Sequence, residues 1–324
     1  MKKIILSLLI TGTIYSINGQ QLGQYSQYIN NLYLINPAAA GAEEGIDINL
    51  GFRQQWVGFD NSPQNYYISI NSPVNLGKAT LVNPSLRISS TDLESSIENN
   101  SLKLKHGIGG YIAADNYGPF NRISGVLSYA IHLPVAKKFH WSFGFNTGIS
   151  NMNFNQNDIT LINNTDATFT TFTANQNQRT NYLDVNAATL LYNKNFYFGY
   201  TANQILQNKI YFGDTPTNSK LNIHHFITGG YHFKINESVK LSPSCLIKYM
   251  SPAPLSMDYT LKVSIQDKYF GGFSYRNGDA LIALLGAKFN DMFRIAYSFD
   301  YTLSGLADYN SGGHEIMLGI NFNK

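Results

Sequence analysis

The feature of this sequence that most constrains its fold is a period-2 alternation of apolar and polar residues, which returns along the whole chain. Residues spaced by two lie on the same face of a β-strand, so strict alternation with one apolar face predicts half-buried strands. The pattern is clearest in residues 139–153, where Trp141, Phe143, Phe145 and Ile149 alternate with Ser142, Gly144, Asn146, Gly148 and Ser150. About fourteen such strands are predicted: 46–57, 64–71, 104–114, 121–133, 139–153, two flanking 193–195, two flanking 236–237, and segments near 258–265, 273–275, 280–290, 293–301 and 314–322.

Composition indicates that these strands meet lipid. Charged residues make up 13% of the chain and aromatic residues 14%, whereas a soluble domain has about 25% charged residues. After the N-terminal segment, no uncharged apolar run reaches the length that a membrane helix requires. The pattern therefore predicts an all-β transmembrane antiparallel β-barrel of the outer membrane. A large secreted β-sandwich is the alternative.

The predicted connections alternate in length. The short ones include Asn193–Asn195, Asn236-Glu237, Asp267-Lys268 and Asn290-Asp291, while the long ones are Asn155–Thr180 and Leu206–Leu221. Short periplasmic turns and longer external loops are typical of an outer-membrane barrel, so the long loops are predicted to be external. An even number of strands then predicts that both termini are periplasmic, in the outer membrane of a Gram-negative bacterium.

The chain is predicted to have three parts. Residues 1–19 have the basic start, apolar run and small residue that indicate a secretory signal peptide. Residues 20–45, polar and without alternation, are interpreted as an N-terminal periplasmic arm, and residues 46–324 as the barrel. Without Lys2 and Lys3 the chain carries 21 basic and 20 acidic residues, a balance that argues against a nucleic-acid partner.

No pattern in the sequence indicates an enzyme. His224 and His225 are adjacent on a strand and point to opposite faces, and no Cys/His metal spacing, P-loop or dinucleotide motif is present. We therefore expect no catalytic residues, no metal and no cofactor. The charges on the polar parity are expected to face the lumen, because they would be costly against lipid: Arg53, Arg122, Lys262 and Arg294.

Several short motifs resemble a known family. They are Asn36-Pro37-Ala38 with Gly41, the run 52–59 (F-R-Q-Q-W-V-G-F), Ser62-Pro63, Asn121-Arg122, Pro243-Ser244 with Lys248, Phe273-Ser274-Tyr275-Arg276 and His314-Glu315-Ile316. Together they resemble the PorP/SprF family of type IX secretion system outer-membrane proteins. The run 52–59 is the most specific of them. The connection after Val74 is longer than in that family.

The resemblance implies a non-enzymatic barrel component of the type IX secretion and gliding motility machinery. Such a protein assists export or surface attachment of a large secreted adhesin-like cargo, or contacts periplasmic secretion components. An outer-membrane diffusion channel or ligand transporter is the alternative. The sequence does not distinguish a core component from a cargo-specific accessory, nor an open lumen from a plugged one.

A protein partner of the barrel needs a binding surface, and the short predicted turns between strands offer little area for one. We therefore hypothesise that the periplasmic partner docks on the arm Gln20–Ala42 and on the polar connection Ser72–Lys103. The candidate partner-binding residues come from these segments and from the family-like run: Asn36, Pro37, Gly41, Arg53, Gln55, Trp56, Gly58, Phe59, Asp92 and Glu94.

Overall fold

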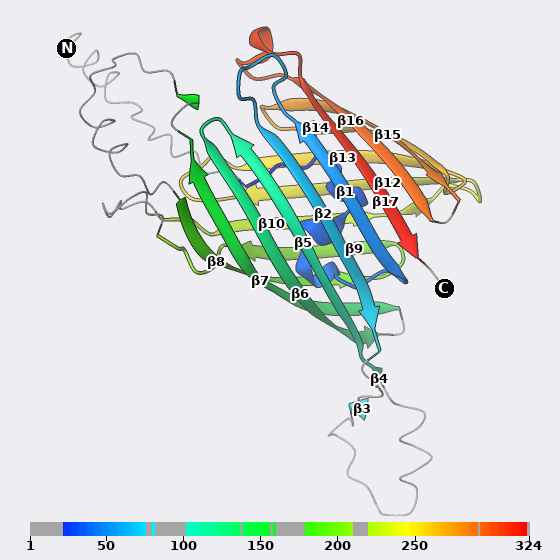
Figure 1. The fold of residues 1–324 in the computed structure, drawn as a ribbon. Helices are drawn as coiled ribbons and strands as arrows, with labels where there is room; N and C mark the ends of the chain where they lie inside the picture. The colour runs from blue at the N-terminus through cyan, green and yellow to red at the C-terminus, as the bar shows by residue number, and fades with distance from the viewer. Residues whose placement is uncertain are drawn as a thin grey trace, which may run out of the picture.

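The strands form one closed antiparallel β-barrel (Figure 1). The computed structural model describes residues 22–75, 80–81, 102–136, 138–155, 158–159, 179–209, 220–290 and 292–322. The strands of the wall are β1 (Ile46–Gln54), β2 (Gln64–Val74), β5 (Lys105–Tyr117), β6 (Phe120–Ala136), β7 (Phe139–Phe154), β8 (Arg179–Tyr192), β9 (Phe196–Asn203), β10 (His224–Tyr231), β11 (Phe233–Lys234), β12 (Val239–Tyr249), β13 (Ser256–Ile265), β14 (Tyr269–Arg276), β15 (Ala280–Phe289), β16 (Phe293–Thr302) and β17 (Gly313–Phe322). Both β10 and β11 pair with β12 and only His232 separates them, so they are two parts of one strand and the barrel has fourteen strands.

The first and last strands close the barrel. Ile46 of β1 lies opposite Phe322 of β17, and the ladder continues to the pair Gln54 and His314. On the far side, β10 pairs with both β9 and β12. The predicted all-β, antiparallel, fourteen-stranded architecture is confirmed. Within the described residues, no helix is long and apolar enough to cross a membrane.

Alternation along the strands separates lipid from lumen. On β6 and β7, Leu127 and Ile149 are 75% and 65% exposed on the outer face, while Ser128 and Ser150 are buried inside. The four charges predicted to face the lumen do so. Arg53 is buried, Arg122 pairs with Asp115, Lys262 reaches Asn30 of the arm, and Arg294 pairs with Asp47 and donates to Asn49.

The predicted first strand was too long at its C-terminal end. β1 ends at Gln54, and Trp56 follows it with a left-handed φ of 52° in the connection to β2. After β2, the described part of the long connection forms a short ribbon of β3 (Thr80–Leu81) and β4 (Leu102–Lys103). Asp92 and Glu94 lie outside the described residues.

The N-terminal arm, which was interpreted from the sequence as periplasmic, lies inside the barrel. It contains three 3-10 turns, η1 (Tyr28–Asn30), η2 (Leu32–Leu34) and η3 (Pro37–Ala39), drawn in dark blue within the barrel in Figure 1. Leu22 lies against Arg122, near the β5–β6 turn, whereas the Ala42 carbonyl accepts a hydrogen bond from Lys105 at the other end of β5. The arm therefore runs the length of the lumen.

This path separates the first described residue from the start of β1. The even strand number does place Ile46 and Phe322 at the same end of the barrel. Because the arm passes back through the lumen before Ile46, the first described residue, Leu22, lies toward the opposite end.

Candidate functional site in the barrel lumen

The segment Asn36–Gly41 forms a compact turn whose shape follows from its sequence. Asn36 caps η3, since its Oδ1 accepts the backbone N–H of Ala38 at 2.9 Å, and Pro37 occupies the first position, where no donor is needed. Gly41 adopts a φ of +68°, which favours glycine, and its N–H donates to Asn71 Oδ1 at 3.0 Å. The motif N-P-A-A-A-G is thus a capped turn with a glycine exit.

Two glycines of the wall allow this turn to approach closely. A Cβ on Gly107 would lie 1.8 Å from the Ala40 carbonyl oxygen, and a Cβ on Gly144 would lie 2.4 Å from the Ala38 nitrogen. Real Cβ contacts are never this short, so the arm backbone touches the wall only because both positions are glycine. We define Gly107 and Gly144, with the space that they leave on the wall, as the glycine groove.

Polar side chains of the wall hold the same backbone. Ser142 Oγ donates to the Ala38 carbonyl at 2.7 Å, and His132 Nε2 lies 2.8 Å from the Ala40 carbonyl. Because a carbonyl oxygen only accepts, Nε2 must carry the proton, and Nδ1 then accepts from the Tyr192 hydroxyl at 2.9 Å.

Tyrosines of the arm also bond the wall. The Tyr33 hydroxyl lies 2.8 Å from Ser128 Oγ, and the Tyr28 hydroxyl lies 3.3 and 3.2 Å from the Ser244 and Thr260 hydroxyls. Both tyrosines are buried, so these hydrogen bonds join the arm to β6, β12 and β13 away from solvent.

The N-terminal part of the arm is held by an ionic cluster. We define this charged cluster as the buried side chains of Arg53, Asp258, Arg276, Asp300 and Glu315, which project from β1, β13, β14, β16 and β17. Its ion pairs join Arg53 to Asp300 at 2.8 Å and to Glu315 at 3.4 Å, and Arg276 to Asp258 at 2.7 Å and to Asp300 at 3.4 Å.

Ser26 of the arm lies at the centre of the charged cluster. Its backbone N–H donates to Glu315 at 2.6 Å, and the next N–H, of Gln27, donates to the same carboxylate at 3.2 Å. The Ser26 hydroxyl donates to Asp300 at 2.9 Å and accepts from Arg53 at 3.0 Å. Hydrogen bonds to ionised partners are about twice as strong as neutral ones, so Ser26 is a main anchor of the arm.

The ion pairs continue beyond the charged cluster. Lys248 pairs with Asp258 at 3.0 Å and Asp279 pairs with Arg276 at 3.3 Å, which gives three cations and four anions around the arm. Buried charges are tolerated when they are paired, and each of these has at least one partner of opposite charge. Such an arrangement is suited to holding a segment in place.

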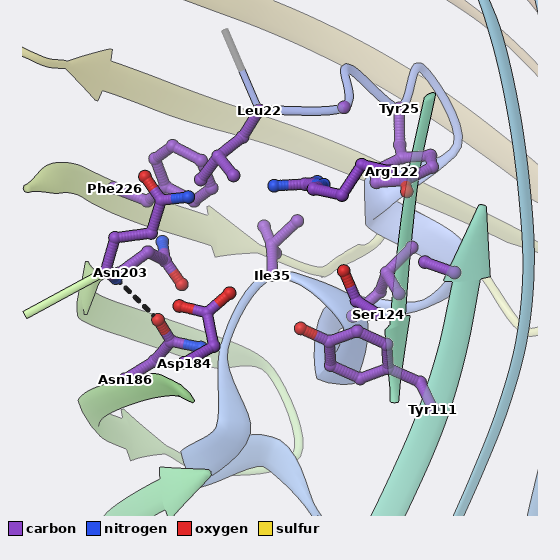
Figure 2. Close-up of a pocket in the computed structure, with 14 residues that line it drawn as sticks. Leu22, Tyr25, Ile35, Tyr111, Arg122, Ser124, Asp184, Asn186, Asn203 and Phe226 are labelled. Carbon is purple, nitrogen blue, oxygen red and sulfur yellow. Dashed lines mark hydrogen bonds between the residues drawn. The ribbon is translucent and has the colours of Figure 1, made fainter. Parts of the chain in front are cut away.

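A small cavity remains between the arm and the wall (Figure 2). Its volume is about 60 Å³, and Arg122, Asp184 and Asn203 are among the side chains around it. Within it Asp184 Oδ1 and Gln204 Oε1 have no protein partner. At 10–15 Å³ per water, the cavity holds a few water molecules, which suits these two acceptors.

The predicted partner-binding residues divide into two groups. Asn36, Pro37 and Gly41 belong to the buried arm turn, and Arg53 is 1% exposed in the charged cluster, so none of them presents a surface. In the described conformation these four residues are not accessible to a partner.

Four further predicted residues that the structure describes lie in the connection between β1 and β2, at one rim of the barrel. The Gln55 N–H donates to the Pro63 carbonyl, and Val57 exchanges backbone hydrogen bonds with Ser311 and Gly312 of the β16–β17 connection. Gly58 has a φ of +109° there, and Phe59 is 39% exposed. Gln55, Trp56, Gly58 and Phe59 therefore form a rim separate from the arm.

Sequence reasoning missed several residues of the site. Arg276 and Glu315 lie in motifs that carried the family resemblance but were assigned no role. Asp258 and Asp300 occupy the polar parity of their strands, which was the available signal. Ser26 could not be predicted, because nothing in the sequence near it indicates that charged side chains from five strands surround it.

The fold and the site together define a class: an outer-membrane β-barrel whose lumen is filled by its own N-terminal segment. The family model "Type IX secretion system membrane protein PorP/SprF" matches residues 17–320, and the chain belongs to this family. None of the curated proteins matches the sequence.

Solved structures similar to this chain are also outer-membrane barrels. The CymD monoaromatic hydrocarbon channel has 10% identity and a TM-score of 0.51, covering 94% of this chain and 95% of its own. The Ralstonia pickettii toluene transporter TbuX has 11% identity and a TM-score of 0.46, covering 90% and 93%. At this identity the likeness to CymD shows the fold alone.

Proposed function

We propose that this protein is a non-enzymatic, plugged barrel of the type IX secretion machinery. In this role it binds a partner, a secreted cargo protein or a periplasmic secretion component, and does not conduct solutes. The observation that carries the proposal is the arm, which crosses the lumen and is bonded to the wall along its length. Family membership supplies the secretion context.

The partner surface must lie outside the lumen, because the arm is buried. Two segments remain from the predicted surface: the rim Gln55–Phe59 and the connection between β2 and β5. The rim is held rigidly by its backbone bonds to Ser311 and Gly312. It exposes Phe59, and the backbone of Tyr309, whose residue is 71% exposed, lies close to Gly58. A preformed aromatic surface binds at a low cost in conformational entropy.

Purification from native membranes followed by identification of co-purifying proteins tests this function. We expect type IX components or a large secreted protein with the intact chain, and their loss when residues 81–99 are replaced by a short Gly/Ser linker or when Phe59 and Tyr309 are changed to Ser. Recovery of the same partners with all these changes combined would place the binding surface elsewhere.

The second candidate is a channel for small solutes, which the fold shared with CymD favours. Planar-bilayer recordings separate the two functions. A plugged barrel gives no steady conductance, whereas stable unitary currents from the unmodified protein would favour the channel.

A further inference from the structure

The family-like motifs that the proposed function leaves unexplained meet at one place, on the arm. Arg53, Arg276 and Glu315 come from three separate motifs and surround Ser26. The motif Asn36–Gly41 fills the glycine groove. These motifs are distant in the sequence, and each of them contacts residues 26–41 or belongs to them.

We propose that the lumen wall is a peptide-binding site, and that residues 26–41 occupy it as a separable intramolecular ligand. The site has two subsites. The charged cluster binds the backbone N–H groups of Ser26 and Gln27, and the glycine groove binds the turn Asn36–Gly41. The ligand class is a short peptide with small side chains in a capped turn. This inference rests on the plugged lumen of the proposed function but not on any secretion partner.

The contacts have the chemistry of peptide recognition. The wall binds the backbone of the arm. Glu315 accepts hydrogen bonds from two consecutive N–H groups, and Ser142 and His132 donate to two carbonyls. The glycine groove adds close backbone approach, since the Ala38 nitrogen and the Ala40 carbonyl oxygen lie where a Cβ on Gly144 or Gly107 would be. Both alanine side chains are fully buried, so a larger side chain at either position has no free space.

The arm is joined to the wall by an exposed link. Glu43 and Glu44 are exposed, and β1 begins directly after them at Ile46. The described residues of the arm form no β-ladder with a wall strand. After this link is cut, side-chain contacts, backbone contacts and burial are what attach the described arm to the wall. A binding site retains the cut segment, whereas a segment held only by its covalent connection leaves.

The experiment inserts a protease recognition sequence between Glu43 and Glu44 of the full chain. The protein is purified in detergent, labelled on the arm, cleaved and passed through a size-exclusion column. We expect the fragment to elute with the barrel, and Glu315→Gln and Gly144→Ala each to accelerate its release by about tenfold to a hundredfold. Glu237→Gln in an exposed turn and Gly125→Ala, where a Cβ meets nothing within 4 Å, are the matched controls.

Immediate loss of the fragment from the unsubstituted protein would overturn the proposal. So would retention in both variants at the rate of their controls. Partner recovery is measured on uncut protein, so failure here leaves the proposed secretion function standing.

A second measurement does not depend on the folding of any barrel variant. Synthetic peptides of residues 22–42 are added in excess to the cleaved, unsubstituted protein. We expect the natural peptide to displace the labelled fragment and the Ala38→Val peptide to fail, because Ala38 is fully buried and leaves no space for a larger side chain. Equal displacement by both peptides, or by neither, would refute the peptide-binding site.

Discussion

Replacing Arg53 by Met tests whether the charged cluster contributes to stability. Among the described residues, Arg53 is the cation paired with Glu315, whereas Asp300 also has Arg276. Arg53→Met therefore leaves Glu315 buried with two backbone N–H donors and no counter-charge. Breaking a buried pair in this way costs about 3–5 kcal/mol. We expect the free energy of unfolding to fall by this amount, measured by urea titration in micelles and heat-modifiable gel mobility.

A double-mutant cycle separates the ion pair from other effects of the substitution. Glu315→Gln alone weakens charge-assisted bonds to Ser26 and Gln27, worth about 1.5–3 kcal/mol. In Arg53→Met/Glu315→Gln no unpaired carboxylate remains, so the double variant should be about 2 kcal/mol more stable than additivity predicts. The exposed pair of Lys240 and Asp267 is the control, and Lys240→Gln should cost about 0–1 kcal/mol. Additivity of Arg53 and Glu315 within about 0.5 kcal/mol would refute a direct ionic role for the pair.

Three further predictions concern the arm and the orientation of the barrel. Gly107→Ala should expel the arm turn, because its Cβ would overlap the Ala40 carbonyl, and limited proteolysis should then cut the arm while Gly125→Ala stays protected. Tyr33→Phe should speed release of the cleaved arm, because it removes the hydrogen bond to Ser128 Oγ, worth about 0.5–1.5 kcal/mol; release at the unsubstituted rate would contradict it. In a Cys245→Ser background, cysteine at Asn164 or Thr217 should react with an impermeant maleimide on whole cells and cysteine at Asn236 should not; the reverse would invert the predicted orientation.

The wall could be predicted from the sequence because one physical rule acts on every strand. Lipid outside and a polar lumen inside impose alternation, so segments such as 139–153 predict both their strand and the direction of each side chain. The same rule placed Arg53 and Arg294 inside correctly. Alternation does not show where strand pairing ends. For this reason the first strand was predicted to continue to residue 57, whereas it ends at Gln54.

The arm could not be predicted by that rule, since it is neither a strand nor a surface loop. Its side chains face the wall on several sides, so its sequence shows no period, and a polar segment without a period resembles a free tail. Its partners are inward-facing polar residues of strands far away in the sequence, such as Asp300 and Ser142. The small-residue run Ala38–Ala40 and the inward glycines Gly107 and Gly144 were separate signals, each common by itself. Only their packing shows that they match, because the space that the glycines leave is filled by the backbone of the arm.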